Sequence, residues 1–215
     1  VQKLETGLDW ATLGALPEMV QTAHGSLHTS LRLQAGQTLL IRGGTTSVGL
    51  TAAILAKELG ATVIATTRKP ERETMLMANG ADHVVIDDGQ IADTVRGLFR
   101  GGVDRVLELV GTTTLLDSLS AAGRGGVVCM TGMVGDSWEF ERFSPMGAIP
   151  TAVSLTTYAG GAEDFMATPL QDCVDEVEKG RAKAPIGMVF DIDDIAEAHK
   201  TMEENRAGGK IVITT

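Results

Sequence analysis

The sequence predicts an α/β fold: a doubly wound parallel sheet followed by a smaller α+β tail. Short apolar, β-branched runs alternate with helical patterns along most of the chain, and the connections between them are short. Each crossover between parallel strands needs a helix, so this alternation indicates a parallel sheet covered on both faces. Right-handed crossovers then make the sheet doubly wound.

Residue patterns place the individual elements. Pro17-Glu18 is expected to begin a first helix that runs to about residue 31, because proline and an acidic residue suit the first turn. Strands are expected at 38–41, 61–66, 83–86, 103–110 and 126–130, with a sixth at 151–158. Helices are expected between them at 48–59, 70–80, 91–99 and 115–121. The tail is expected to hold a helix (169–179), a strand (188–190), a helix (195–204) and a last strand (210–214).

Composition narrows the class of protein. The 215 residues include 28 acidic and 18 basic side chains, a formal net charge of −10, which argues against a nucleic-acid partner. No apolar run reaches the ~18 residues of a membrane span. Only two cysteines are present, too few for a disulfide framework, and no Cys-x-x-Cys pair suggests structural zinc. We therefore expect a cytoplasmic protein with no membrane partner and no metal site.

A glycine-rich turn at 42–49 separates the first predicted strand from the next helix. In an open α/β sheet this is where a nucleotide pyrophosphate sits, held by free backbone N–H groups and the helix dipole. Gly43 is expected to allow the tight turn, and Gly49 to let the helix pack close to the strand. Phosphate oxygens can also accept from three hydroxyl groups in the turn, those of Thr45, Thr46 and Ser47.

The residues of this turn argue against two other kinds of site. A phosphate-binding loop of the nucleoside triphosphatases needs Gly-Lys-Ser/Thr, whereas this chain has Gly49-Leu50-Thr51. A nucleophile elbow needs G-x-S-x-G, and Thr45 stands where its first glycine should be. A strand–turn–helix corner that binds no ligand stays open from the turn alone.

The end of the second predicted strand favours NADP over NAD. An acid about 20 residues after the turn would bind the ribose 2′-hydroxyl of NAD, but this chain has Thr66-Thr67-Arg68-Lys69 and no acid before Glu71. Arg68 and Lys69 suit the 2′-phosphate of NADP, because arginine can bind it with two hydrogen bonds. The alternative is that Arg68, Lys69 and Arg72 belong only to a solvated loop and the start of a helix.

Two later strand ends also carry small or polar residues. Val110-Gly111 and Thr131-Gly132-Met133 follow the fourth and fifth strands, at the edge where ligands of such sheets bind. Either glycine alone is equally well explained by the needs of a turn.

Taken in order, these segments resemble the medium-chain dehydrogenase/reductase superfamily. The resemblance is closest to its zinc-independent, quinone-oxidoreductase-like branch, often described as the zinc-binding alcohol dehydrogenase family. The segments that carry it cover nearly the whole chain: 16–19, 22–23, 43–50, 55–61, 80–84, 102–104, 108–111, 132–133 and 208–212.

The resemblance implies a Rossmann domain that binds NADP(H), in an NADPH-dependent oxidoreductase that passes hydride to a small-molecule quinone, enone or carbonyl substrate. It implies a pyrophosphate site at the glycine turn and contacts to adenosine and nicotinamide from the later loops. Relatives often have glycine at the place of Thr46, and this departure would tighten or crowd the pyrophosphate contact. The expected cofactor-binding residues are Thr22, Gly43, Gly44, Thr45, Thr46, Ser47, Val48, Gly49, Thr67, Arg68, Lys69, Val110, Gly111, Thr131, Gly132, Met133 and Tyr158.

Relatives also carry a catalytic lobe ahead of the first helix, which would hold any zinc ligands and most substrate contacts. The expected division is an NADP-binding domain at 17–158, with 1–16 and 159–215 belonging to or leading from that lobe. We expect this chain to be the cofactor-binding portion and to be inactive alone, so no catalytic residue is assigned in it. The alternative is a non-catalytic NAD(P)-binding module, such as a sensor or an assembly subunit.

The remaining candidate functional residues have weaker support. His24 and His28 lie four residues apart on a helix, but two ligands without a nearby Cys or acid make a poor metal site. Tyr158 lacks the lysine that short-chain reductases place four residues later, and it is expected instead to line the nicotinamide end. Relatives often form homodimers through the nucleotide domain, and 151–157 is the edge strand where two copies would pair.

Overall fold

The computed structural model describes residues 1–215 and contains a six-stranded sheet with the strand order β3-β2-β1-β4-β5-β6. Every neighbouring pair of strands is parallel. The order reverses between β1 and β4, which is the arrangement of a doubly wound, Rossmann-type sheet, so the predicted fold class is confirmed. The strands are β1 (Thr38–Arg42), β2 (Thr62–Thr67), β3 (His83–Ile86), β4 (Val103–Glu108), β5 (Ala122–Met130) and β6 (Ser154–Thr157).

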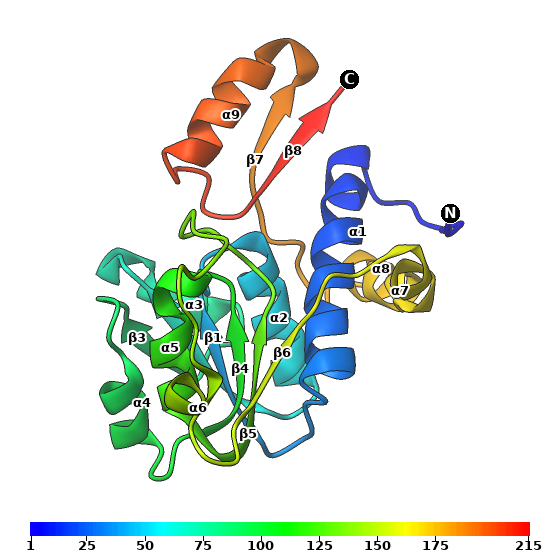
Figure 1. Ribbon diagram of the computed structural model, residues 1–215. Helices are drawn as coiled ribbons and strands as arrows, with labels where there is room; N and C mark the ends of the chain where they lie inside the picture. Colours follow the sequence, from blue (N-terminus) through cyan, green and yellow to red (C-terminus); the bar gives the residue numbers. More distant parts are fainter.

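Helices flank this sheet on both faces (Figure 1). None of them is both long enough and apolar enough to cross a membrane. The helices are α1 (Trp10–His24), α2 (Ser47–Glu58), α3 (Glu73–Ala78), α4 (Ala92–Leu98), α5 (Thr112–Ala121), α6 (Pro145–Ala148), α7 (Ala162–Ala167), α8 (Leu170–Glu178) and α9 (Ile195–Glu203).

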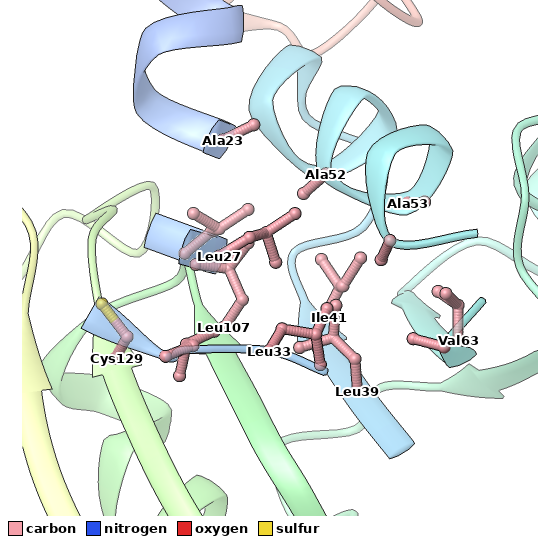
Figure 2. Packing of buried hydrophobic residues seen from close by; sticks show 14 residues of the cluster. Ala23, Leu27, Leu33, Leu39, Ile41, Ala52, Ala53, Val63, Leu107 and Cys129 are labelled. Atoms are coloured by element: carbon pink, nitrogen blue, oxygen red, sulfur yellow. The ribbon is translucent and has the colours of Figure 1, made fainter. Parts of the chain in front are cut away.

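One core layer lies between the sheet and the pair α1 and α2. Figure 2 shows Ala52 and Ala53 of α2 above Leu39 and Ile41 of β1, which are fully buried. The small alanine side chains let α2 approach the sheet closely, so the N-terminus of α2 is held directly over the carboxyl end of β1. Burial of this layer is the main force that fixes the glycine turn between β1 and α2 in place.

The opposite face of the sheet is covered by α4 and α5. Leu40 and Val106 point to this face and pack against Val95 of α4 and Leu119 of α5, all completely buried. Successive residues of β1 therefore enter two different cores, because side chains alternate across a strand. Burial on both faces explains the consecutive apolar residues in the middle of β1 and β2 (39–41 and 63–65), as the sequence predicted.

The first helix begins earlier than predicted. Helix α1 starts at Trp10 rather than Pro17, and the chain continues after it in a π-helical turn, Gly25–Ser30. The cause is Asp9, whose carboxylate accepts a hydrogen bond of 2.9 Å from the N–H of Thr12 and so caps the helix. Pro17 lies inside α1, where it removes one helical N–H without ending the helix. The predicted domain boundary at residue 17 therefore falls within a helix.

The tail forms the expected α+β unit. Strands β7 (Ile186–Asp191) and β8 (Lys210–Thr214) pair in parallel as a separate two-stranded sheet, with α9 between them in sequence. In Figure 1 this unit, coloured orange and red, lies apart from the six-stranded sheet. Helix α8 packs on α1 through a buried cluster that includes Leu16 and Val174. The N-terminal segment lies along α8, where Gly7 donates its N–H to Glu178 at 2.8 Å.

Candidate functional site

A cleft of about 1180 Å³ opens at the carboxyl ends of the parallel strands. This is the edge of an open α/β sheet at which ligands bind, and the cleft is larger than most small-molecule pockets, which hold ~300–1,000 Å³. Its walls come from four segments. They are the glycine turn with the end of β2 (Gly43, Thr45, Thr46, Ser47, Thr66, Thr67, Arg68, Lys69, Arg72), the residues after β3 (Asp87, Asp88, Gly89), the loops after β4 and β5 with the start of α5 (Val110, Thr113, Thr114, Val134, Gly135) and residues of 202–211.

The glycine turn has the conformation that its glycines predict. Gly43 has φ +84°, a left-handed value that favours glycine. A Cβ on Gly49 would lie 2.7 Å from the carbonyl oxygen of Gly43 and 2.9 Å from the Cα of Gly44. Helix α2 therefore begins in contact with the strand end, as expected for Gly49. Gly44 itself is held against β2, because its Cβ would lie 2.9 Å from the Cβ of Ala65.

Thr46 caps helix α2. Its hydroxyl group donates to the carbonyl oxygen of Gly43 at 3.0 Å and accepts from the N–H of Gly49 at 2.9 Å. Both hydrogen bonds of the hydroxyl are thus made within the turn, whereas the sequence predicts it as a donor to a phosphate. Because Thr46 has an extended backbone, φ −74° and ψ 159°, the turn needs no glycine there. The Thr46 hydroxyl therefore links Gly43 to Gly49 within the turn.

Three backbone N–H groups at the start of α2 remain free. Those of Thr45, Ser47 and Val48 make no hydrogen bond, although the neighbouring N–H groups of Thr46 and Leu50 are bonded within the turn. The hydroxyl groups of Thr45 and Ser47 are also unbonded, and both residues line the cleft. A helix N-terminus with unpaired N–H groups attracts an anion.

Two cations end strand β2 at another wall of the cleft. Arg68 and Lys69 line the cleft, and neither side chain makes a hydrogen bond or an ion pair. The Thr67 hydroxyl shapes this corner by accepting from the N–H of Lys69 at 3.1 Å. The two charges therefore remain available for an anionic group of a ligand.

A buried ionic network, which sequence reasoning missed, supports the floor of the cleft. The fully buried guanidinium of Arg42 donates twice to Asp87, at 2.9 Å each, and once to Asp117 at 2.6 Å. Burial alone would raise the pKa of Asp87, but its bonds to Arg42 outweigh burial and hold that pKa below its ordinary value. The sequence features that could have indicated this network are Arg42, a charged residue at the end of an apolar strand, and the pair Asp87-Asp88 after β3.

This network is connected to the glycine turn. The Thr66 hydroxyl donates to Asp87 at 3.2 Å and accepts from the N–H of Gly43 at 3.1 Å. The charge of the Asp87 carboxylate is therefore balanced by Arg42, and its oxygens already accept hydrogen bonds from Arg42 and Thr66. It presents little free negative charge to the cleft.

Glu108 holds the loop after β4. Its Oε1 atom accepts from the N–H groups of Val110 and Gly111, at 2.7 and 3.1 Å, and its Oε2 atom accepts from the Ser118 hydroxyl. Complete burial raises the pKa of Glu108, and these donors together with Arg42 oppose that shift. Because Glu108 binds the residues just before α5, that helix begins at Thr112, earlier than the predicted residue 115.

The loops after β4 and β5 pack against each other. A Cβ on Gly132 would lie 2.5 Å from the carbonyl oxygen of Leu109, and the N–H of Gly135 donates to the carbonyl oxygen of Val110 at 2.8 Å. Only Val110 of the predicted residues in these loops lines the cleft, and the structure adds Val134 and Gly135 from the same loops. Gly111, Thr131, Gly132 and Met133 are not among the residues that line the cleft.

The predicted residues Thr22 and Tyr158 lie outside the cleft lining. Thr22, on α1, donates to Glu18 at 3.3 Å. Tyr158 packs onto Gly25, where an added Cβ would fall 2.0 Å from the Cζ atom of the ring, and its buried hydroxyl has no hydrogen-bond partner. Gly44, Val48 and Gly49 belong to the glycine turn and its helix but do not line the cleft. Direct contact between these three residues and a cofactor stays a prediction.

The tail supplies a wall that the sequence did not reveal. Residues between 202 and 211, in the turn from α9 to β8, face the glycine turn across the cleft. Lys210 in this segment forms an ion pair with Glu18 of α1. A Gly208-Gly209 pair before the last strand was the only local signal, and it does not say which surface the turn meets.

A second, smaller cavity of about 300 Å³ lies between α1, α2 and α8. His24 and His28 line it with their rings 4.4 Å apart, and burial lowers the pKa of each. Cys173 lies there too, and burial with nearby carboxylates raises its pKa to about 11. No group of three or more His, Cys, Asp or Glu side chains is placed to hold a metal ion, so these residues do not fit a zinc site.

Comparison with known proteins identifies the family. Residues 79–213, more than half of the chain, match the family model described as zinc-binding dehydrogenase. The chain is 27% identical over 219 residues to the quinone oxidoreductase of Pongo abelii and to that of Homo sapiens. Each comparison covers 99% of this chain and 65% of the relative, so the chain spans slightly less than two thirds of these relatives' length.

Solved structures share the fold. A mycobacterial protein in complex with NADPH has a TM-score of 0.86 at 25% identity, over 99% of this chain and 67% of that chain. An NAD-dependent alcohol dehydrogenase has a TM-score of 0.80 at 26% identity, over 97% of this chain and 60% of that chain. The chain therefore belongs to the zinc-binding dehydrogenase family, within the medium-chain dehydrogenase/reductase superfamily.

Proposed function

We propose that the cleft binds NADP(H) and that the protein is an NADPH-dependent oxidoreductase which reduces a quinone, enone or carbonyl compound. The observation that carries the proposal is the joint presence, in one cleft, of free N–H groups at the start of α2 and free cations at the end of β2. The relatives named quinone oxidoreductases support the class of substrate.

The glycine turn would hold the pyrophosphate. The N–H groups of Thr45, Ser47 and Val48 are unpaired at the positive end of the 12-residue helix α2, and the hydroxyls of Thr45 and Ser47 add two donors. These donors do not have to move when an anion binds, because the packing of α2 on the sheet already fixes their positions. Thr46 contributes by holding the turn closed rather than by direct contact.

The end of β2 would select the 2′-phosphate. An NAD-type site places a carboxylate where it can accept from the ribose 2′-hydroxyl. Here the position carries Arg68 and Lys69, and the carboxylate of Asp87, which also lines the cleft, is bonded to Arg42. A phosphate dianion would thus meet two uncompensated cations, which favours NADP over NAD.

When bound, the nicotinamide cofactor supplies the hydride, and the protein's contribution is to bind, orient and shield it. In this chain the turn and the loops after β4 and β5 would fix the cofactor along the strand ends. The family description names zinc, but the residues of this chain do not fit a zinc site, so no step is assigned to a metal.

Direct titration tests the cofactor proposal. NADPH and NADH are titrated separately into the protein, and cofactor fluorescence reports the two dissociation constants. We expect NADPH to bind at least about tenfold more tightly, since hydrogen bonds to charged groups contribute ~1.5–3 kcal/mol. Arg68→Gln combined with Lys69→Gln should remove most of this preference, whereas Arg100→Gln, a cation outside the cleft, should not. Equal affinities, or no binding, would overturn the proposal.

An activity assay tests the substrate class. The full-length protein is incubated with NADPH and a set of quinones, enones and aldehydes, and oxidation of the cofactor is followed by absorbance. Turnover of at least one acceptor supports the reductase, while tight NADPH binding without turnover of any acceptor by the full-length protein favours a non-catalytic nucleotide-binding module.

A further inference from the structure

One side chain bridges the two walls of the cleft. Arg72, in the 3₁₀ turn after β2, donates from Nη2 to the carbonyl oxygen of Asn205 at 2.8 Å and from Nη1 to the Oδ1 atom of Asn205 at 3.3 Å. Both residues line the cleft. No other side-chain hydrogen bond or ion pair joins the segment after β2 to residues 202–211, which we call the C-terminal wall.

The backbone at Asn205 is shaped to present both acceptors. Asn205 has φ +52°, in the left-handed region that asparagine tolerates better than most residues. The turn is stabilised from within by the N–H of Arg206, which donates to the carbonyl oxygen of Thr201 at 3.0 Å. The carbonyl and side-chain oxygens of Asn205 therefore face a single guanidinium group.

The three cations of this corner differ in what they bind. The side chains of Arg68 and Lys69 are free, whereas Arg72 is held by two neutral oxygen acceptors of the C-terminal wall. A guanidinium binds a phosphate more strongly than a neutral oxygen, because the phosphate adds a negative charge and accepts two parallel hydrogen bonds. A phosphate that enters this corner therefore competes with Asn205 for Arg72.

We propose that Arg72 is a clasp: it holds the C-terminal wall against the segment after β2 and is transferred from Asn205 to the 2′-phosphate when an NADP-type cofactor binds. This rests on the function proposed above. The 2′-phosphate thereby both selects the cofactor and releases the wall. A dinucleotide with a plain 2′-hydroxyl leaves the clasp closed, because it offers Arg72 no stronger partner.

The two partners of the clasp give opposite effects on affinity. Arg72→Gln removes a phosphate ligand and should weaken NADPH binding about tenfold. Asn205→Gly keeps the left-handed backbone but removes one acceptor that competes for Arg72, so NADPH should bind a few-fold more tightly. A hydrogen bond that only stabilised the fold would shift both variants in the same direction. NADH affinity should change little in either variant.

Hydrogen exchange of the C-terminal wall provides the second readout. Amide exchange of peptides covering 202–211 is measured by mass spectrometry in the wild type, Arg72→Gln and the control Arg100→Gln, each alone, with NADPH and with NADH. We expect NADPH, but not NADH, to speed exchange of this segment in the wild type. Arg72→Gln alone should already exchange faster, and Arg100→Gln should match the wild type.

The outcomes separate this proposal from the proposed function. Normal NADPH binding with slowed or unchanged exchange of 202–211 would overturn the clasp and leave the cofactor assignment standing. Unchanged exchange in cofactor-free Arg72→Gln would also overturn the clasp. Undetectable NADPH binding by the wild type would overturn the proposed function, and the transfer of Arg72 to a phosphate with it.

Discussion

The guanidinium of Arg42 and the carboxylate of Asp87 form two parallel hydrogen bonds of 2.9 Å, joining the end of β1 to the end of β3 across the strand between them. Arg42 is fully buried, and the side chain of Asp87 is 8% exposed. This pair fixes the strand ends on which the cleft is built.

Removing Arg42 should destabilise the protein strongly. Arg42→Met leaves Asp87 and Asp117 as buried charges without their partner, and breaking a buried pair in this way costs about 3–5 kcal/mol of unfolding free energy. Urea unfolding followed by circular dichroism measures the loss. The control is Arg206→Gln, which breaks exposed ion pairs on the tail and should have little effect. Equal losses in the two variants would contradict a structural role for the network.

The same pair predicts a dependence of stability on pH. The pKa of Asp87 is held below its ordinary value of 3.8 by Arg42, against the opposing effect of burial. A carboxyl group whose pKa is lowered in the native state stabilises the fold at pH values above its ordinary pKa. This stabilisation is lost as the pH falls through the native pKa. The unfolding free energy should therefore fall as the pH is lowered below about 3.8. Asp87→Asn should be less stable at pH 7 and should show a shallower acid dependence, measured by urea unfolding at each pH.

Adding a methyl group at Gly49 should be harmful. In Gly49→Ala the new Cβ would lie 2.7 Å from the carbonyl oxygen of Gly43, so α2 must move away from the strand. We expect a loss of about 1–3 kcal/mol in unfolding free energy together with weaker NADPH binding. Gly97→Ala is the matched control, because nothing lies within 4 Å of its Cβ and it is in helix α4. That variant should be more stable by about 0.5–1 kcal/mol. A stabilising effect at Gly49 would refute the close approach.

The cap at Thr46 can be tested with a conservative pair. Thr46→Ala removes the acceptor of the Gly49 N–H and the donor to Gly43, and should cost about 0.5–2 kcal/mol. Thr46→Ser keeps both bonds and should stay close to the wild type. NADPH titration of both variants shows whether the cap also orders the free N–H groups. If Ala and Ser behave alike, the hydroxyl has no such role.

The open edge of the sheet gives a prediction about assembly. Strand β6 pairs in the sheet only with β5, so it is an edge strand, and the Ser30 hydroxyl donates to the Thr157 carbonyl oxygen at its end at 2.9 Å. We propose that two copies pair through this edge, because unpaired strand edges are templates for further strands. Light scattering should then give a dimer mass for the wild type and a monomer mass for Ser154→Lys combined with Thr157→Lys, which charges the edge. Ser120→Lys, on α5, should remain dimeric. A monomeric wild type would refute the proposal.

Much of the fold could be predicted because it depends on local rules. The apolar runs, the glycines and the short connections define six strands and their crossovers, and Gly43 and Gly49 have the local geometry for which glycine is needed. The predicted start of α1 at Pro17 is wrong, because the capping bond of Asp9 allows the helix to begin earlier and Pro17 lies inside it. The sequence predicts the Thr46 hydroxyl as a phosphate donor and does not reveal its partners Gly43 and Gly49, because the shape of the turn is not evident from the residues.

The sequence by itself determined the fold class, the position of the glycine turn and the presence of cations after β2. Each follows from residues close together in the chain, where backbone sterics and side-chain periodicity act. Tertiary structure alone decided which of these residues share a cleft, that Arg42 neutralises Asp87, and that Asn205 holds Arg72. Those relationships join residues far apart in sequence, and burial and charge pairing between such residues depend on how the whole chain packs.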